Sequence, residues 1–283
     1  MRKLKIFLTA VAAISAFQFS HAQTRPVSDE FGFVEYLIGN NLQGDAVKLL
    51  SQDIFHPSDS LDYLRGWADY NAKRLEEASV QFDKVGAESS FYDKSLFFNA
   101  ISNAHLGNYD KCQRLLESYS GPYRELLNLE QAGLAILRDR PDEYLRAASG
   151  FTYSQYTLTE SERQLMDIYN KRYIEKSKSP ALAAAASAVI PGLGKIYAGE
   201  LGEGLSSFMA VGSLAAITAE NWSRNGITNW KTILFGTLGA AFYIGNIYGS
   251  YVTVSIHNND LRNAQDTAVL YHIHIPIRNC FNQ

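Results

Sequence analysis

The sequence TILFGTLGAAFYIGNIYGSYVTVSI, residues 232–256, contains no charged side chain over its whole length. Crossing a bilayer core takes roughly 20 helical residues, so this run predicts a membrane-spanning helix. A second apolar run precedes it and predicts another span over about 203–221. Trp222 and Trp230 flank the polar residues between the two runs, a position typical of aromatic side chains at a bilayer surface. We therefore expect a membrane module to organise the chain.

The membrane module begins with a broken segment. Ser179 and Pro180 are typical of a helix start, and the apolar residues 181–190 that follow are too few to span a bilayer. The sequence PGLGKIYAG, residues 191–199, then interrupts the run. We expect the module to cover 179–258, with a broken entry helix before the two spans. A third span over 181–197 is the alternative, and it would place the C-terminus on the other side of the membrane.

The glycines of this entry resemble the signature of small bacterial two-helix membrane modules. These are the TM2-like domains and a related Bacteroidetes-type module with the pattern Pro-Gly-Leu-Gly-x-x-Tyr-x-Gly. The resemblance covers about residues 176–258 and implies two membrane helices, without an activity to carry over. TM2-like domains usually have an aspartate in the second helix, which residues 232–256 lack. The motif residues are Pro191, Gly192, Gly194, Tyr197, Gly199, Gly202 and Gly204.

A small residue recurs every four positions along the second predicted span. Small side chains let membrane helices approach each other closely. We expect this stripe to pack the two spans as a hairpin, and a homodimer through Gly245 and Gly249 is the alternative. The stripe consists of Ala241, Gly245, Gly249 and Thr253.

The N-terminus has the composition of a secretory signal peptide. Basic residues precede an apolar run over 6–19, and Ser20-His21-Ala22 forms a small-x-small cleavage site. We expect residues 1–22 to be removed, so that the mature chain begins at Gln23; an uncleaved anchor is the alternative. Residues 23–178 would then face the periplasm, held at a bacterial inner membrane.

Residues 23–178 contain an internal repeat. Residues 61–83 align with 95–117, a shift of 34 positions, and the aligned residues recur at the spacing of one helix face. A helix pair cannot bury such a face alone, so the pattern predicts pairs that stack into an all-α solenoid. The period and the residues LGNYDKC, 106–112, resemble the tetratricopeptide repeat family. Gly107 falls where that family turns between its helices, and Cys112 where its small packing residue sits.

Large residues on the first helices of these pairs are candidates for a partner groove, because aromatic side chains anchor many interfaces. Their counterparts one repeat later are apolar and lie on the same face, which favours packing inside the helix pair. The groove candidates are Tyr63, Trp67, Tyr70 and Phe97.

The sequence after the membrane module predicts a polar tail over 259–283 with a short extended segment. Residues 269–275 form this segment, which Pro276 limits. His272 and His274 would point to one face of a strand, a spacing that can hold a metal. Because they have no neighbouring cysteine or carboxylate, we interpret them as surface histidines. The two cysteines, Cys112 and Cys280, lie too far apart in sequence to indicate a disulfide framework.

No catalytic motif accompanies this architecture. The sequence lacks a P-loop, an H-E-x-x-H and a G-x-S-x-G, and a net charge of −3 gives no basic face for nucleic acid. We expect no enzyme and no cofactor, but a membrane-tethered scaffold or adaptor whose repeats bind another protein, in envelope or membrane-protein assembly. The alternative is a membrane-embedded enzyme or transport accessory that acts through the glycine-rich module. Its titratable groups would be Lys195, Glu200 and Glu203.

Overall fold

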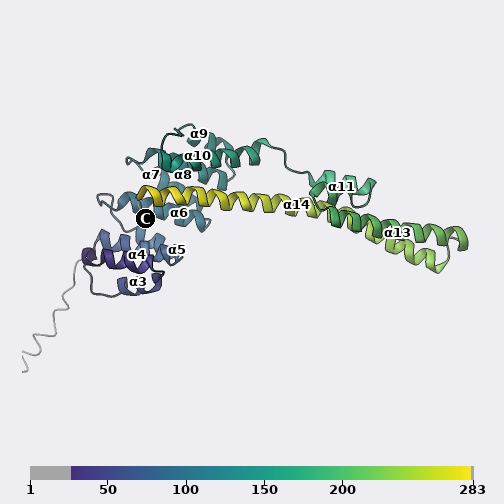
Figure 1. The fold of residues 1–283 in the computed structure, drawn as a ribbon, viewed down its shortest axis with the longest axis horizontal. Coiled ribbons are helices and arrows are strands. Elements are labelled where there is room, and N and C mark those ends of the chain that lie inside the picture. Colours follow the sequence, from purple (N-terminus) through teal and green to yellow (C-terminus); the bar gives the residue numbers. More distant parts are fainter. Residues whose placement is uncertain (1–26, 282–283) are drawn as a thin grey trace, which may run out of the picture. The chain divides into compact units, whose positions relative to one another are not determined.

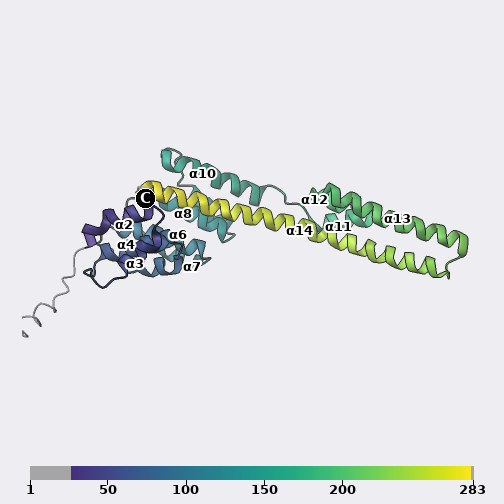
Figure 2. The same cartoon turned by 60° about the horizontal axis from the view of Figure 1, so that its bottom comes forward.

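The computed structural model describes residues 27–281, and every regular element in that range is a helix (Figure 1, Figure 2). The all-α class predicted from the sequence is confirmed for these residues. The predicted signal peptide, residues 1–22, and the predicted start of the mature chain at Gln23 lie outside them. The described chain forms two compact units. Unit 1 comprises residues 27–165 and 270–281, and unit 2 comprises residues 166–269.

Unit 1 is built from helices that follow one another as pairs. After the short 3-10 helix η1 (Val27–Glu30), these are α2 (Phe31–Gly39) and α3 (Gln43–Leu50), α4 (Asp59–Asn71) and α5 (Leu75–Phe82), α6 (Tyr92–His105) and α7 (Tyr109–Ser118), and α8 (Arg124–Leu137) and α9 (Pro141–Ala148). From α2 to α9, each helix packs on the one before it in the chain. Helix α10 (Tyr156–Tyr169) follows and continues into unit 2.

The same turn joins the two helices of every pair. In each turn one residue has a positive φ, between 60° and 75°. The backbone N–H after it donates to the carbonyl five residues back at 2.8–2.9 Å, which is the Schellman arrangement that ends many helices. Lys73 and Gly107, which the shift of 34 positions aligns, both have this conformation, and two further turns of this kind flank them. The positive-φ residues are Asn41, Lys73, Gly107 and Asp139.

The small position of the first helix lets the members of a pair come close. A Cβ added to Gly66 on α4 would lie 2.6 Å from the ring of Phe82 on α5. Ala78 and Cys112, the small residues predicted for the second helices, are 0% and 3% exposed. The apolar helix faces predicted from the internal repeat are therefore the faces that become buried within the helix pairs.

Unit 2 contains the predicted membrane module. A π-helical turn, η2 (Asn170–Ile174), is followed by α11 (Pro180–Val189), α12 (Leu193–Ala198) and α13 (Leu201–Asn225). Helix α14 (Trp230–Phe281) contributes residues up to Val269 to this unit and its last residues to unit 1. Ser179 caps α11 as expected, because its Oγ accepts a hydrogen bond from the backbone N–H of Leu182.

By length and composition, one helix of the described chain is able to cross a membrane, and that helix is α13. The predicted span over 203–221 lies within it. The predicted span over 232–256 lies within α14, which does not meet the same criterion of apolar composition. The second span stays a prediction.

The prediction of an extended segment over residues 269–275 is wrong. These residues are helical and form part of α14. The alternation of histidine and isoleucine suggested a strand. The buried side chains nevertheless recur every four positions, which is the spacing of one helix face. Pro276 lies inside the helix and is buried, so it does not end the segment. The buried residues are Ile273, Ile277 and Phe281, each at most 5% exposed.

Candidate functional site

The last residues of α14, Leu270–Phe281, pack against the first helices of successive pairs in unit 1. We call them the C-terminal segment. The ring of Phe281 lies 5.9 Å from that of Phe97 on α6 and 4.9 Å from that of Tyr123, the residue before α8. Arg278 lies over the ring of Trp67 on α4. We call the surface that the segment covers the inner face, because it is made by the first helix of each pair.

The four residues predicted to line a partner groove are all buried: Tyr63, Trp67, Tyr70 and Phe97. Three of them contact the C-terminal segment, and Tyr70 does so through the ring of His274, whose centroid lies 5.8 Å away. Tyr63 instead stacks on Phe91 at 4.8 Å. The predicted groove residues thus pack the interior, and part of what they pack against is a helix from the other end of the chain.

Cationic and imidazole groups surround the middle of the C-terminal segment. The ring of His274 lies 6.0 Å from that of His105 on α6. Burial, His105, Arg278 and Lys73 together lower the pKa of His274 to about 4. Burial and Lys73 also lower the pKa of His105. The packed surroundings therefore disfavour the charged form of both imidazoles.

Acidification should loosen this packing. A histidine with a lowered pKa in the folded state contributes stability above its ordinary pKa near 6.5, and that stability is lost as the pH falls towards the folded pKa. Between pH 6.5 and pH 4 we expect unit 1 to lose on the order of 1–3 kcal/mol through His274. Thermal unfolding of the full chain in detergent at both pH values measures this loss. His274→Gln should flatten the pH dependence; equal slopes for the unaltered chain and this variant would refute the assignment.

A buried polar network, which no sequence motif predicted, joins α5, α6 and α7. Ser79 Oγ donates to Asn99 Oδ1 at 2.7 Å and accepts from Asn103 Nδ2 at 2.9 Å. Asn99 Nδ2 also donates to Asp83, which pairs with Lys111. The spacing of Asn99 and Asn103, two asparagines one helical turn apart, was its signal in the sequence. Because the groups satisfy one another, the network fixes how the three helices pack.

Burial disfavours the charged forms of two titratable groups in unit 1. Glu130 on α8 is 2% exposed, and burial raises the pKa of its carboxyl group well above the ordinary value. Burial, followed by the influence of Glu130, raises the pKa of the Cys112 thiol. A thiol in such surroundings is a poor nucleophile, because the thiolate is the reactive form. Cys112 and Cys280 are free cysteines.

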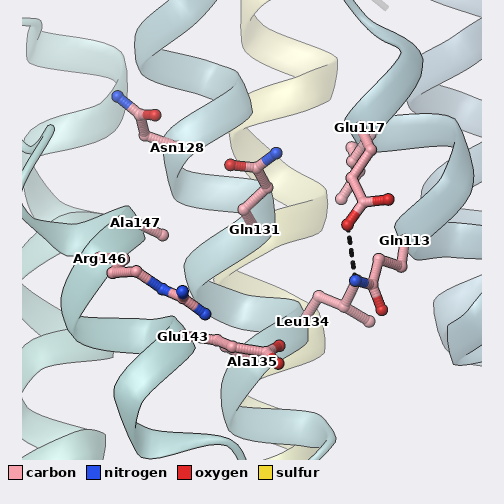
Figure 3. Close-up of a pocket in the computed structure, with 10 residues that line it drawn as sticks. Gln113, Glu117, Asn128, Gln131, Leu134, Ala135, Glu143, Arg146 and Ala147 are labelled. Carbon is pink, nitrogen blue, oxygen red and sulfur yellow. Dashed lines mark hydrogen bonds between the residues drawn. The ribbon is translucent and has the colours of Figure 1, made fainter.

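A cavity of about 290 Å³ opens between α7, α8 and α9 (Figure 3). Side chains from all three helices converge on it, and most carry an amide or a charge. Gln113 Nε2 donates to Glu117 Oε1 at 2.6 Å along one wall. Amide groups donate and accept hydrogen bonds at once, as a peptide backbone does. We call this cavity the polar groove; its polar residues are Gln113, Glu117, Asn128, Gln131, Glu143 and Arg146.

Several motif residues of the membrane module meet in unit 2. A Cβ added to Gly192, whose φ is +85°, would lie 2.0 Å from the carbonyl oxygen of Gly204. One added to Gly194 would lie 2.1 Å from the carbonyl oxygen of Ala183 on α11. Tyr197 Oη accepts a hydrogen bond from the backbone N–H of Ser179 at 3.1 Å. Gly199 ends α12 with a φ of +110°, Pro191 precedes Gly192, and Gly202 has nothing within 4 Å of an added Cβ.

The small stripe of the second predicted span lies on α14. The close approaches of α13 and α14 occur nearer the turn between them, where Gly236 faces Thr218 and Gly239 faces Leu214. Within the stripe, a Cβ added to Gly245 would meet nothing within 4 Å, and one added to Gly249 would lie 3.7 Å from Lys195 Cε. Ala241 and Gly245 line a cavity, and Thr253 Oγ1 donates to the carbonyl oxygen of Gly249.

The histidines of the C-terminal segment do not form the strand face that the sequence predicted. In a helix His272 and His274 point in different directions, because successive residues turn by about 100°. Within residues 27–281, no three histidine, cysteine or acidic side chains are grouped to hold a metal ion.

Comparison of the chain with family models, with curated proteins and with solved structures finds no match.

Proposed function

We propose that this chain is a membrane-tethered adaptor. A tetratricopeptide-like solenoid, unit 1, is held at the periplasmic face of a bacterial inner membrane by a two-helix module in unit 2, and it binds another protein. The observation that carries the proposal is the polar groove, an open cavity between α7, α8 and α9 whose walls carry amide and charged side chains.

Unit 1 contains parts of the chain from both sides of unit 2, and this arrangement supports a membrane hairpin. Residues 27–165 and residues 270–281 pack into the same unit, so both lie on the same side of any membrane. The chain between them must then cross an even number of times. If α13 crosses, the first part of α14 must return. Helix α11, at about 15 Å, is too short for a core about 30 Å thick, which favours two spans over three.

The polar groove is the surface that we assign to the partner. The inner face is already covered by the C-terminal segment, whereas the groove between α7, α8 and α9 is open. Three amide side chains and the charges of Glu117, Glu143 and Arg146 suit an extended polar segment of another protein. Tethering keeps anything bound there close to the membrane, which raises its effective concentration for a second binding event.

Site-specific crosslinking in the native host tests the proposal. A photoreactive amino acid at Gln131, inside the polar groove, should give a reproducible adduct with one protein. Arg146→Glu should reduce this adduct at least fivefold, because it reverses a charge in the groove. Arg114→Glu makes the same change on an exposed residue of α7 that does not line the groove, and it should leave the adduct unchanged.

Two results would overturn the adaptor. The first is an adduct that Arg146→Glu and Arg114→Glu affect equally, since the groove would then not be the contact surface. The second is recovery of a deletion mutant by residues 166–269 alone behind the signal peptide, since the membrane module would then carry the function without unit 1.

A further inference from the structure

A larger cavity, of about 720 Å³, lies between α13 and α14 of unit 2. Small-molecule sites have volumes of roughly 300–1,000 Å³, so this one is large enough for an elongated ligand. Its walls are mostly apolar or small. They include Ser206, Ala210 and Val211 on α13 and Ala241, Phe242 and Gly245 on α14.

Asn246 on α14 lines the same cavity and is 6% exposed. Within residues 27–281, neither its Nδ2 nor its Oδ1 has a hydrogen-bond partner. A buried polar group without a partner destabilises the fold, and the core of a bilayer holds no water to act as that partner. A ligand in the cavity would give the Asn246 amide the hydrogen-bond partner that it lacks.

A charged pair stands at one end of the cavity. Lys195 Nζ lies 3.3 Å from Glu203 Oε2, and both residues line the cavity. Glu203 also borders a neighbouring depression, together with Glu200, His257 and Asp260. The end of the cavity thus offers one ammonium group and several carboxylates, which match a ligand that carries a phosphate and an amine.

The polar and apolar parts of the cavity follow the order expected of a bilayer. Glu203 lies in the first turn of α13, whereas Val211 lies about 12 Å further along the helix. If α13 spans the membrane, the charged end lies near one surface and the apolar walls lie towards the middle. An amphiphile with its headgroup at the surface and its chain in the interior has the same order.

We propose that this cavity binds one phospholipid with an amine headgroup, its phosphate at Lys195 and its ammonium at Glu203. The inference rests on the membrane location proposed above. An acidic headgroup without an amine would satisfy Lys195 but would add negative charge beside Glu200, Glu203 and Asp260. A helix from a second copy would fill the small stripe but would bring no phosphate to Lys195.

Native mass spectrometry of the full chain in detergent, with equal amounts of phosphatidylethanolamine and phosphatidylglycerol added, tests this site. We expect one retained phosphatidylethanolamine, at least fivefold in excess over phosphatidylglycerol. Gly245→Leu should abolish the adduct, because the new side chain fills open space in the cavity. Gly212→Leu is the matched control, since an added Cβ also meets nothing there and the residue does not line the cavity.

The headgroup preference has its own variant. Glu203→Gln should reduce the preference for phosphatidylethanolamine at least threefold, and Glu220→Gln, at the other end of α13, should not change it. Equal retention of the two lipids by the unaltered chain, or an adduct that survives Gly245→Leu, would overturn the proposal. So would a dimer that Gly245→Leu dissociates, because the occupant would then be a second copy.

The membrane location is checked separately, by carbonate extraction of host membranes. Release of the chain into the soluble fraction would overturn both the tether and the lipid site. Retention in the membrane together with no lipid preference would overturn the lipid site alone and leave the adaptor standing.

Discussion

Phe281→Ala should lower the free energy of unfolding of unit 1 by about 3–5 kcal/mol, which is the usual cost of removing a buried phenylalanine. The ring is 5% exposed and contacts Phe97, Phe98 and Tyr123. Its loss leaves a cavity where the C-terminal segment meets α6 and the start of α8. Thermal unfolding of the full chain in detergent, followed by circular dichroism, measures the effect.

Tyr271→Ala is the matched control for this change. Tyr271 lies on the same segment, is also aromatic and is 58% exposed, so its removal should cost less than about 0.5 kcal/mol. Limited proteolysis should show faster cleavage of the C-terminal segment in Phe281→Ala and not in Tyr271→Ala. Equal stability of the two variants would mean that the segment does not hold unit 1 together.

The C-terminal segment also marks the limit of what the sequence predicts. Residues 272–275 alternate histidine with isoleucine, and residues 269–275 contain three β-branched side chains, so local preference favoured a strand. The segment is helical, and its side chains meet aromatic residues of α4 and α6, through Arg278 over Trp67 and through Phe281 beside Phe97. Those residues lie more than 150 positions earlier in the chain, and no local pattern carries that information.

The helix pairs show the opposite case. The sequence indicates the turns at Gly107 and at its aligned residue Lys73, since a glycine and a regular apolar pattern mark the end of the first helix. The turns at Asn41 and Asp139 adopt the same left-handed conformation without glycine. Asparagine and aspartate tolerate that conformation better than most residues, which is the signal that a search for glycine overlooked. The fold class and the apolar faces were therefore predictable, whereas the left-handed residues of the flanking turns were not.

The polar groove and the cavity of unit 2 were not predictable for a different reason. Each is formed by side chains from separate helices. The cavity of unit 2 includes the motif residue Gly202 and the stripe residues Ala241 and Gly245, but its buried amide, Asn246, belongs to neither pattern. Asn246 illustrates the problem, because an asparagine in an apolar run reads as a tolerated polar residue. Its significance comes from burial without a hydrogen-bond partner, which only the packing of α14 reveals.

Gly194→Ala should destabilise unit 2 by about 3 kcal/mol or more. The new Cβ would lie 2.1 Å from the carbonyl oxygen of Ala183 and 2.7 Å from Ser187 Oγ. Forcing an atom into a packed site commonly costs about 1–3 kcal/mol, and a backbone atom of α11 can move aside less easily than a flexible side chain. The change should also break the hydrogen bond that the backbone N–H of Gly194 donates to Ser187 Oγ at 2.9 Å.

Gly202→Ala is the control that separates the clash at Gly194 from the general effect of replacing a helical glycine by alanine. Both glycines lie within helices, where alanine is favoured over glycine by up to about 1 kcal/mol. An added Cβ at Gly202 meets nothing within 4 Å, so this variant should be as stable as the unaltered chain or slightly more so. Thermal unfolding and gel filtration in detergent compare the two. If Gly194→Ala were as stable as Gly202→Ala, α11 and α12 would not be packed as described, and the glycine motif would need a role other than close approach.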